Sequence, residues 1–161
     1  MAMKGVALLV ALLGACGAGV LDPGQAVTGD GEPSDTQAPE GAVREFERLA
    51  NAHRARVGCG PLRWDAATGR VAQAQAEDMV RRDFFSHTNP DGQSPFDRLR
   101  TAGVTYVAAA ENIAFGYPTA AAVLDAWVRS DGHRRNLENC GYTHHGVGLQ
   151  QEKWVQVFIG R

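Results

Sequence analysis

Apolar positions recur at helical spacing over much of the chain and gather into strand-like runs at its end. The three-and-four spacing of apolar side chains predicts helices at residues 42–57, 66–84, 96–102 and 120–129. The final runs, 143–150 and 153–159, are rich in β-branched and aromatic residues, which predicts two strands joined by a tight turn. Helices first and strands last are typical of an α+β domain, in which helices cover an antiparallel sheet.

Polar and small residues mark where these helices begin and end. Asp65 is a candidate N-cap for the second helix, and Pro95 suits the first turn of the third. An extended segment, 104–107, leads to Glu111 and Asn112. The stretch 130–137 ends the fourth helix, and we expect it to turn on its glycine and to present His133 where the next segment begins.

The amino terminus differs from the rest of the chain. One lysine precedes an apolar run at residues 5–13 that is too short to span a bilayer, which predicts an export signal over residues 1–15. Leu13-Gly14-Ala15-Cys16 matches a bacterial lipobox, so we expect Cys16 to be lipidated. The alternative is ordinary signal cleavage, with Cys16 incidental. Either outcome predicts an exported protein: a cell-envelope lipoprotein, in the outer membrane if the host is diderm, or a secreted one.

Residues 16–40 are rich in Gly, Pro, Ser, Thr and acids and contain no aromatic residue, which predicts a flexible acidic tether before a domain at 41–161. The whole chain carries a net charge of −2. Without residues 1–40 its 18 acids and 16 bases fall to 13 and 15, which leaves the domain at about +2. That charge is too small to predict nucleic-acid binding.

The remaining cysteines, Cys59 and Cys140, form one pair in an exported domain, which favours a disulfide between them. The alternative, free thiols or metal ligands, is weaker because they lack the CxxC spacing of zinc sites.

Five motifs occur in a fixed order along the domain. They are Phe84-Phe85-Ser86-His87, Ala110-Glu111-Asn112-Ile113-Ala114, the run from Trp127 through Ser130-Asp131-Gly132-His133 to Leu137, Gly146-Val147-Gly148, and Trp154-Val155-Gln156-Val157-Phe158. Together they resemble the bacterial branch of the CAP superfamily, also called SCP-like, which comprises cysteine-rich secretory proteins, antigen 5 and plant pathogenesis-related proteins. The resemblance covers about residues 42–161.

The resemblance implies an α-β-α sandwich and a shallow cleft that holds two histidines and two acids. The histidines correspond to His87 and His133, and one acid corresponds to Glu111. The second acid would follow Trp127 by three residues, where this chain has Ser130. That departure weakens any catalytic role carried over from the family.

Two neutral imidazoles, His87 and His133, could hold a divalent ion such as Zn²⁺ weakly, with water completing the site. Glu111 could then be a third ligand, an acceptor that orients an imidazole, or a base that activates water. The same three groups could act as an acid–base pair without metal. The sequence leaves these alternatives open.

Other candidate residues favour structural roles. His144 and His145 are adjacent on a predicted strand and must point to opposite faces, so at most one could face the cleft. Asn112 and Asn136 are expected to hold the motif loops by hydrogen bonds. The tryptophans are expected in the core: Trp64, Trp127 and Trp154.

We therefore expect a monomeric scaffold without required cofactor that binds an extracellular ligand, such as a lipid or cell-envelope component, and touches the membrane only through its N-terminal lipid. A metal-dependent hydrolase, with a His-held ion and Glu-activated water, is the first alternative. Lipid or sterol binding, known for some relatives, is the second. No phosphate loop, HExxH or GxSxG motif is present, which counts against nucleotide binding, a zincin and a serine hydrolase.

Overall fold

A computed structural model describes residues 37–161 of the chain. The expected signal at 1–15, Cys16 with its expected lipidation, and most of the expected tether lie outside the described residues. Among the helices of residues 37–161, none has both the length and the hydrophobicity needed to cross a bilayer.

Five helices and four strands make up the described part of the chain. The helices are α1 (Gln37–Arg56), α2 (Ala66–Arg81), α3 (Pro95–Thr101), α4 (Ala120–Arg129) and α5 (Asp131–Leu137). The strands are β1 (Arg63–Trp64), β2 (Ala108–Phe115), β3 (His144–Gln150) and β4 (Lys153–Gly160).

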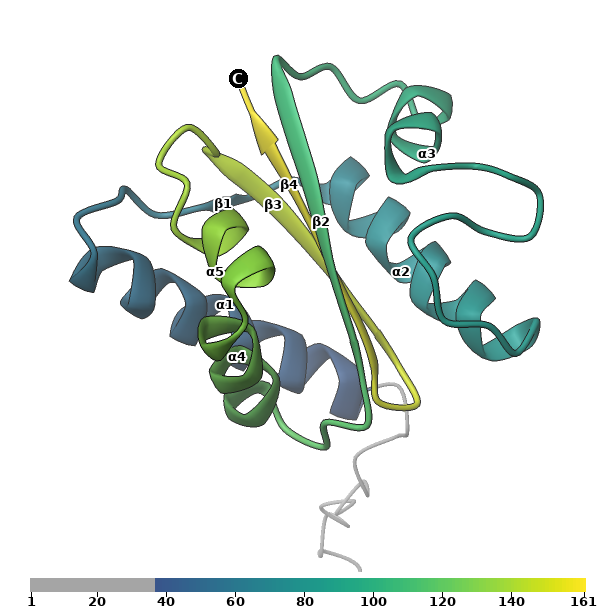
Figure 1. The fold of residues 1–161 in the computed structure, drawn as a ribbon, viewed down its shortest axis with the longest axis horizontal. Coiled ribbons are helices and arrows are strands. Elements are labelled where there is room, and N and C mark those ends of the chain that lie inside the picture. The colour runs from purple at the N-terminus through teal and green to yellow at the C-terminus, as the bar shows by residue number, and fades with distance from the viewer. Residues whose placement is uncertain (1–36) are drawn as a thin grey trace, which may run out of the picture. The chain divides into compact units, whose positions relative to one another are not determined.

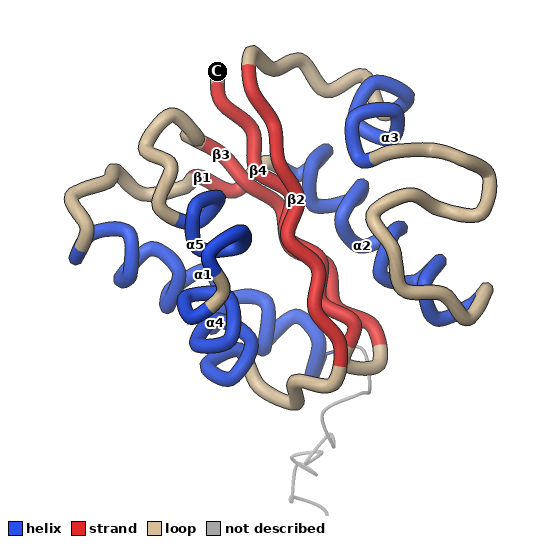
Figure 2. Tube along the Cα trace, viewed as in Figure 1, coloured by secondary structure: helices blue, strands red, loops and turns tan. Residues whose placement is uncertain are grey.

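The strands form one sheet in the order β1-β3-β4-β2, with β4 antiparallel to both of its neighbours. Figures 1 and 2 show α1, α4 and α5 on one side of this sheet and α2 and α3 on the other, which confirms the predicted α-β-α sandwich. The three long strands pair antiparallel as predicted, and the parallel pairing of β1 is the one exception. The two-residue strand β1, which was not predicted, pairs in parallel with β3 because Arg63 N–H donates to the Thr143 carbonyl and Asp65 N–H to the His145 carbonyl.

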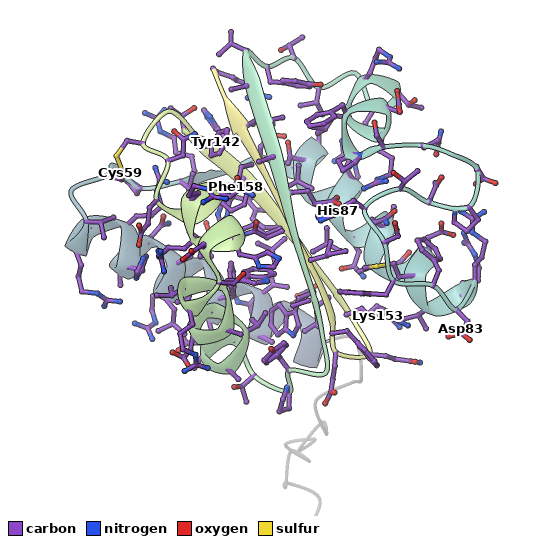
Figure 3. The ribbon with its side chains drawn as sticks, in the orientation of Figure 1. Cys59, Asp83, His87, Tyr142, Lys153 and Phe158 are labelled. Atoms are coloured by element: carbon purple, nitrogen blue, oxygen red, sulfur yellow. A yellow bond between two sulfur atoms is a disulfide. The ribbon has the colours of Figure 1, made fainter. Side chains whose placement is uncertain are left out.

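Each face of the sheet carries its own hydrophobic core, because successive residues of β4 point to opposite faces. Trp154 and Phe158 pack with Phe46 and Trp127 under α1 and α4. On the other face of β4, Val155, Val157 and Ile159 pack under α2 and α3 with Val71, Met79 and Leu99. Phe158 is labelled in Figure 3.

Two of the three tryptophans lie in the core as predicted. Trp127 and Trp154 are buried, whereas Trp64 is 43% exposed, so its expected place in the core is wrong. Trp64 stands on the short edge strand β1, where its indole covers Gly69 instead of packing between layers.

Several elements differ in extent from the sequence prediction. The helix expected from residue 42 begins at Gln37, and the helix expected to reach residue 84 ends at Arg81. Asp65 caps α2 as predicted, accepting a hydrogen bond from Thr68 N–H. The expected extended segment 104–107 precedes the strand, and β2 itself begins at Ala108. Its first three residues are alanines and give no strand signal, and pairing along its whole length with β4 makes it a strand.

The expected turn at Gly132 is also wrong, because Gly132 and His133 lie inside the short helix α5. The helix starts directly after α4, with Ser130 as the shared boundary residue. His133 is therefore held on a helical turn against α4, rather than on a loop.

The predicted disulfide between Cys59 and Cys140 is confirmed, with a Cα–Cα distance of 5.0 Å. It joins the end of α1 to the segment after α5. The buried guanidinium of Arg54 lies beside it and donates hydrogen bonds to the carbonyl oxygens of Gly60, Leu137, Asn139 and Tyr142. The same two segments are thus joined by a covalent bond and by a buried arginine.

Candidate functional site

The candidate site is built over β2, the strand at one edge of the sheet. Neighbouring residues of a strand point to opposite faces, so the side chains of Glu111 and Asn112 face different helical layers. Glu111 faces His87 and Arg98 on the side of α2 and α3, and Asn112 faces α5. In Figure 3 the label of His87 lies on the α2–α3 side of β2.

Glu111 has both carboxylate oxygens occupied by protein groups. Its Oε1 lies 2.8 Å from Nδ1 of His87, and its Oε2 accepts a hydrogen bond of 2.7 Å from the guanidinium of Arg98. The Glu111 side chain is 1% exposed, whereas that of His87 is 50% exposed. Because an ionised carboxylate only accepts, the proton of this pair belongs on Nδ1, which leaves the Nε2 lone pair of His87 free.

Arg98 fixes the loop that carries His87 as well as the carboxylate. One terminal nitrogen of its guanidinium donates to the carbonyl oxygens of His87 and Gln93, and the other binds Glu111. A capping box of Ser94 and Asp97 begins α3 and places Arg98 on its first turn. Arg98 was not identified from the sequence, although the Ser94-Pro95-Phe96-Asp97 start of this helix was a usable signal.

His133 reaches the site from α5 and is held by polar contacts. Its carbonyl oxygen accepts from Asn112 Nδ2 at 3.1 Å, and Asn136 Nδ2 donates to Asn112 Oδ1 at 2.8 Å. Its Nδ1 shares a hydrogen bond of 2.8 Å with Ser130 Oγ, and its ring stacks on Trp127 with centroids 6.1 Å apart. The two asparagines therefore tie α5 to the edge strand.

Burial lowers the pKa of the His133 imidazole, and repulsion from His87, when that ring is protonated, lowers it further. Ser130, at the position where the resemblance implies a second acid, gives this imidazole a neutral partner. Without a carboxylate beside it, nothing offsets the loss of solvation that disfavours the imidazolium. His133 is therefore a neutral ring at pH 7.

A hollow of about 500 Å³, here called the aromatic hollow, opens beside His133. Its lining is mostly apolar and includes Phe85, Phe115, Tyr117 and Trp127. Phe85 and Phe115 lie with ring centroids 6.3 Å apart and remain 50% and 57% exposed. The sequence interpretation missed these two rings; their signal was the placing of a phenylalanine directly before the Ser86-His87 turn and another directly after the Glu111 motif.

The donor set is small for a metal ion. Nδ1 of each histidine and both oxygens of Glu111 are already engaged by protein groups, so the unengaged ligands are the two Nε2 atoms of His87 and His133. Within residues 37–161 no cluster of three or more His, Cys, Asp or Glu side chains has the geometry to hold a metal. Stable zinc sites have three or four protein ligands, so these two histidines fit only a weak ion completed by water or by another ligand.

His144 and His145 lie away from the site, on β3, with β4 between them and β2. His145 is fully buried, with its Nδ1 3.1 Å from Gln156 Nε2. His144 is half-buried, and its Nδ1 pairs with the hydroxyl of Thr143 at 2.9 Å.

Comparison with known proteins gives a consistent match. A family model described as "CAP: Cysteine-rich secretory protein family" matches residues 47–158. Two curated proteins of Bacillus subtilis are each 40% identical: the uncharacterized protein YkwD, over 80% of this chain, and the uncharacterized membrane protein YlbC, over 70%. The matches span 50% and 33% of those two proteins.

Solved structures match over most of the described chain. An extracellular protein containing an SCP domain from Bacillus anthracis is 35% identical with a TM-score of 0.76, and the match covers 78% of this chain and 42% of that one. An outer surface protein of Borrelia burgdorferi is 20% identical with a TM-score of 0.69, over 79% of this chain and 96% of that one. The second match supports the fold alone.

Proposed function

Because the chain belongs to the cysteine-rich secretory protein family, we propose that it is an exported binding module whose ligand site lies over β2, between His87 and His133. Export is supported by the apolar amino terminus, by the disulfide, and by the extracellular SCP-domain relative. A lipid on Cys16 would hold the module at the cell envelope.

One observation carries the binding role: a buried, fully paired carboxylate holds a half-exposed imidazole in place. The Glu111 carboxylate, fixed by Arg98, orients His87 so that its Nε2 faces outward. His133 adds a second, neutral imidazole from the opposite layer. Nε2 of His87 is a preset acceptor, and Nε2 of His133 is a second one in the tautomer whose Nδ1–H donates to Ser130 Oγ. Such a pair can bind a hydroxyl, an amide N–H or a divalent cation.

The arrangement is less suited to the hydrolase alternative. A base that activates water needs an oxygen within reach of that water, whereas both Glu111 oxygens are engaged by protein groups and its side chain is only 1% exposed. Of the roles open to Glu111, the geometry favours the acceptor that orients an imidazole. We therefore propose binding rather than turnover as the function of the site.

Zinc titration of the full chain by calorimetry tests this proposal with the simplest cation that two imidazoles can hold. We expect weak binding that either His87→Ala or His133→Ala removes, while His144→Ala, which alters a histidine on β3, leaves it unchanged. Binding that survives both cleft substitutions would reject these histidines as joint ligands. Binding in the nanomolar range would also contradict a two-histidine site.

The aromatic hollow favours a second candidate function, the binding of an apolar ligand such as an acyl chain. Its lining of Phe85, Phe115, Tyr117 and Trp127 resembles that of apolar ligand sites, and its volume of about 500 Å³ lies within the range of such sites. Dodecanoate binding can be followed by the fluorescence of Trp127. Ala126→Phe should fill the hollow and block binding, whereas Ala121→Phe, on the exposed side of the same helix, should not.

A further inference from the structure

A second cavity, of about 440 Å³, lies between α2, the segment that follows it and the last turn of α3. None of His87, Glu111 and His133 lines it, so it is separate from the site over β2. Its lining is polar and includes Gln75 and Asp78 on α2, Arg82 after that helix, and Arg98 on α3.

Three buried polar atoms of this lining have no hydrogen-bond partner among residues 37–161. They are Oε1 of Gln75, Nε of Arg82 and Nε of Arg98. The Gln75 residue is 1% exposed, and the Arg98 side chain is 9% exposed. Unpaired buried polar atoms are costly and rare, so three of them on residues that line one cavity point to a bound group that completes them.

The chemistry of the missing group follows from these atoms. Gln75 Nε2 donates to the carbonyl oxygen of Ser86 at 2.9 Å, and that oxygen can only accept, so Oε1 must be the atom left unpaired. Oε1 needs a hydrogen-bond donor. The two Nε–H groups need acceptors.

The remaining nitrogens of both arginines are already in use. Arg82 binds Asp78 and Asp91, and Arg98 binds Glu111 and two loop carbonyl oxygens. Four arginines and three acids line the cavity, so positive charge is in excess by one. A carboxylate therefore suits the two Nε–H groups better than a neutral acceptor does.

We propose that this cavity is a second binding site, for a small carboxylate that also carries a hydroxyl or amino donor. The carboxylate accepts from Nε of Arg82 and Arg98, and the donor binds Oε1 of Gln75. Because Arg98 also holds Glu111 and the carbonyl of His87, the ligand contacts the side chain that positions the histidine site. The two sites then share one residue without sharing a cavity.

L-malate and succinate are matched probes, since both are four-carbon dicarboxylates and only malate carries a hydroxyl. Calorimetry on the full chain should show malate binding about fivefold tighter than succinate, the effect of one net hydrogen bond. In ¹H–¹⁵N spectra of the arginine side chains, malate should shift the Nε–H signals of Arg82 and Arg98. The Nε–H signal of Arg129, an exposed arginine that does not line the cavity, should stay in place.

Gln75→Met keeps the shape of the side chain and removes its amide, so it should reduce malate binding to the level of succinate. Gln73→Met is the matched control on the same helix, because the Gln73 amide binds the backbone of Leu149 instead of the cavity. It should leave the preference for malate unchanged. The spectra of the unsubstituted chain test the site even if Gln75→Met fails to fold.

The proposal is overturned if neither acid moves the Nε–H signals at concentrations up to about 50 mM, a limit that corresponds to very weak binding. It is also overturned if malate and succinate bind equally, or if Gln75→Met leaves the preference intact. Failure here would leave the proposed role of His87 and His133 standing, because zinc binding is measured at the other site.

Discussion

Nδ1 of His87 lies 2.8 Å from Oε1 of Glu111, so an imidazole on a loop is anchored to a buried carboxylate on the edge strand. The carboxylate in turn is neutralised by Arg98. The position of the His87 ring therefore depends on Arg98 of α3. Arg98 acts on the ring indirectly, by binding Glu111 and the backbone carbonyl oxygen of His87.

Replacing Arg98 should be far more costly than replacing its exposed neighbour Arg100. Arg98→Ala leaves the Glu111 carboxylate, with 1% of its side chain exposed, without its cation, and the free energy of unfolding should fall by about 3–5 kcal/mol. Arg100→Ala removes an exposed pair with Asp97 on the same helix and should cost less than about 1 kcal/mol. Urea unfolding measures both, and equal losses would contradict the assigned role of Arg98.

The free energy of unfolding of the domain should decrease as the pH falls below about 6.5, and His133 should contribute to this decrease. Its pKa is lowered in the folded state by burial and then by the charge of His87, so the unfolded chain takes up the proton first. The unfolded state is therefore favoured as the pH falls below about 6.5, and the loss is complete below the folded pKa.

Urea unfolding at pH 7.5 and pH 5 in metal-free buffer measures this effect. The unsubstituted chain should lose more stability over this interval than His133→Asn, which keeps a polar group beside Ser130. The same pH dependence in both proteins would show that His133 does not contribute.

The disulfide and Arg54 should support each other, because both join the C-terminal end of α1 and the residues that follow it to the end of α5 and the residues after that helix. Replacing Cys59 and Cys140 with serine should cost about 4 kcal/mol in the chain-entropy model, for a sequence separation of 81 residues. The folded near-ultraviolet spectrum should remain, since Arg54 still binds four carbonyl oxygens.

Adding Arg54→Met to the serine variant should then abolish that spectrum. Arg56→Met, an exposed arginine on the same helix, is the control and should have little effect. A serine variant that unfolds at once would mean that Arg54 alone cannot hold these segments.

Two glycines should respond in opposite ways to alanine. A Cβ at Gly148 would lie 2.4 Å from the backbone of Ala72, so Gly148→Ala should separate α2 from β3 and cost about 3 kcal/mol or more. A Cβ at Gly132, inside α5, meets nothing within 4 Å among the described residues. Gly132→Ala should stabilise the protein by up to about 1 kcal/mol, as expected of alanine in a helix. Thermal unfolding compares them, and a tolerated alanine at Gly148 would contradict the close packing.

The sequence by itself determined the elements with strong local signals. Apolar spacing in α4, the Asp65 cap of α2 and the β-branched run of β4 act within a few residues, so the pattern alone was sufficient. The cysteine pairing was predictable from composition, because Cys59 and Cys140 are the two cysteines of the expected exported domain. The ordered motifs, read as a resemblance, supplied the sandwich.

Only the tertiary structure decided what depends on distant partners. Ala108, Ala109 and Ala110 lie in a strand because β4 pairs with them, and Trp64 is exposed because β1 has only one neighbour. The sequence left the role of Glu111 open among ligand, base and orienting acceptor. Its geometry favours the last, because Arg98 and His87, 13 and 24 residues away, occupy both oxygens, and periodicity within one element carries no information about such contacts.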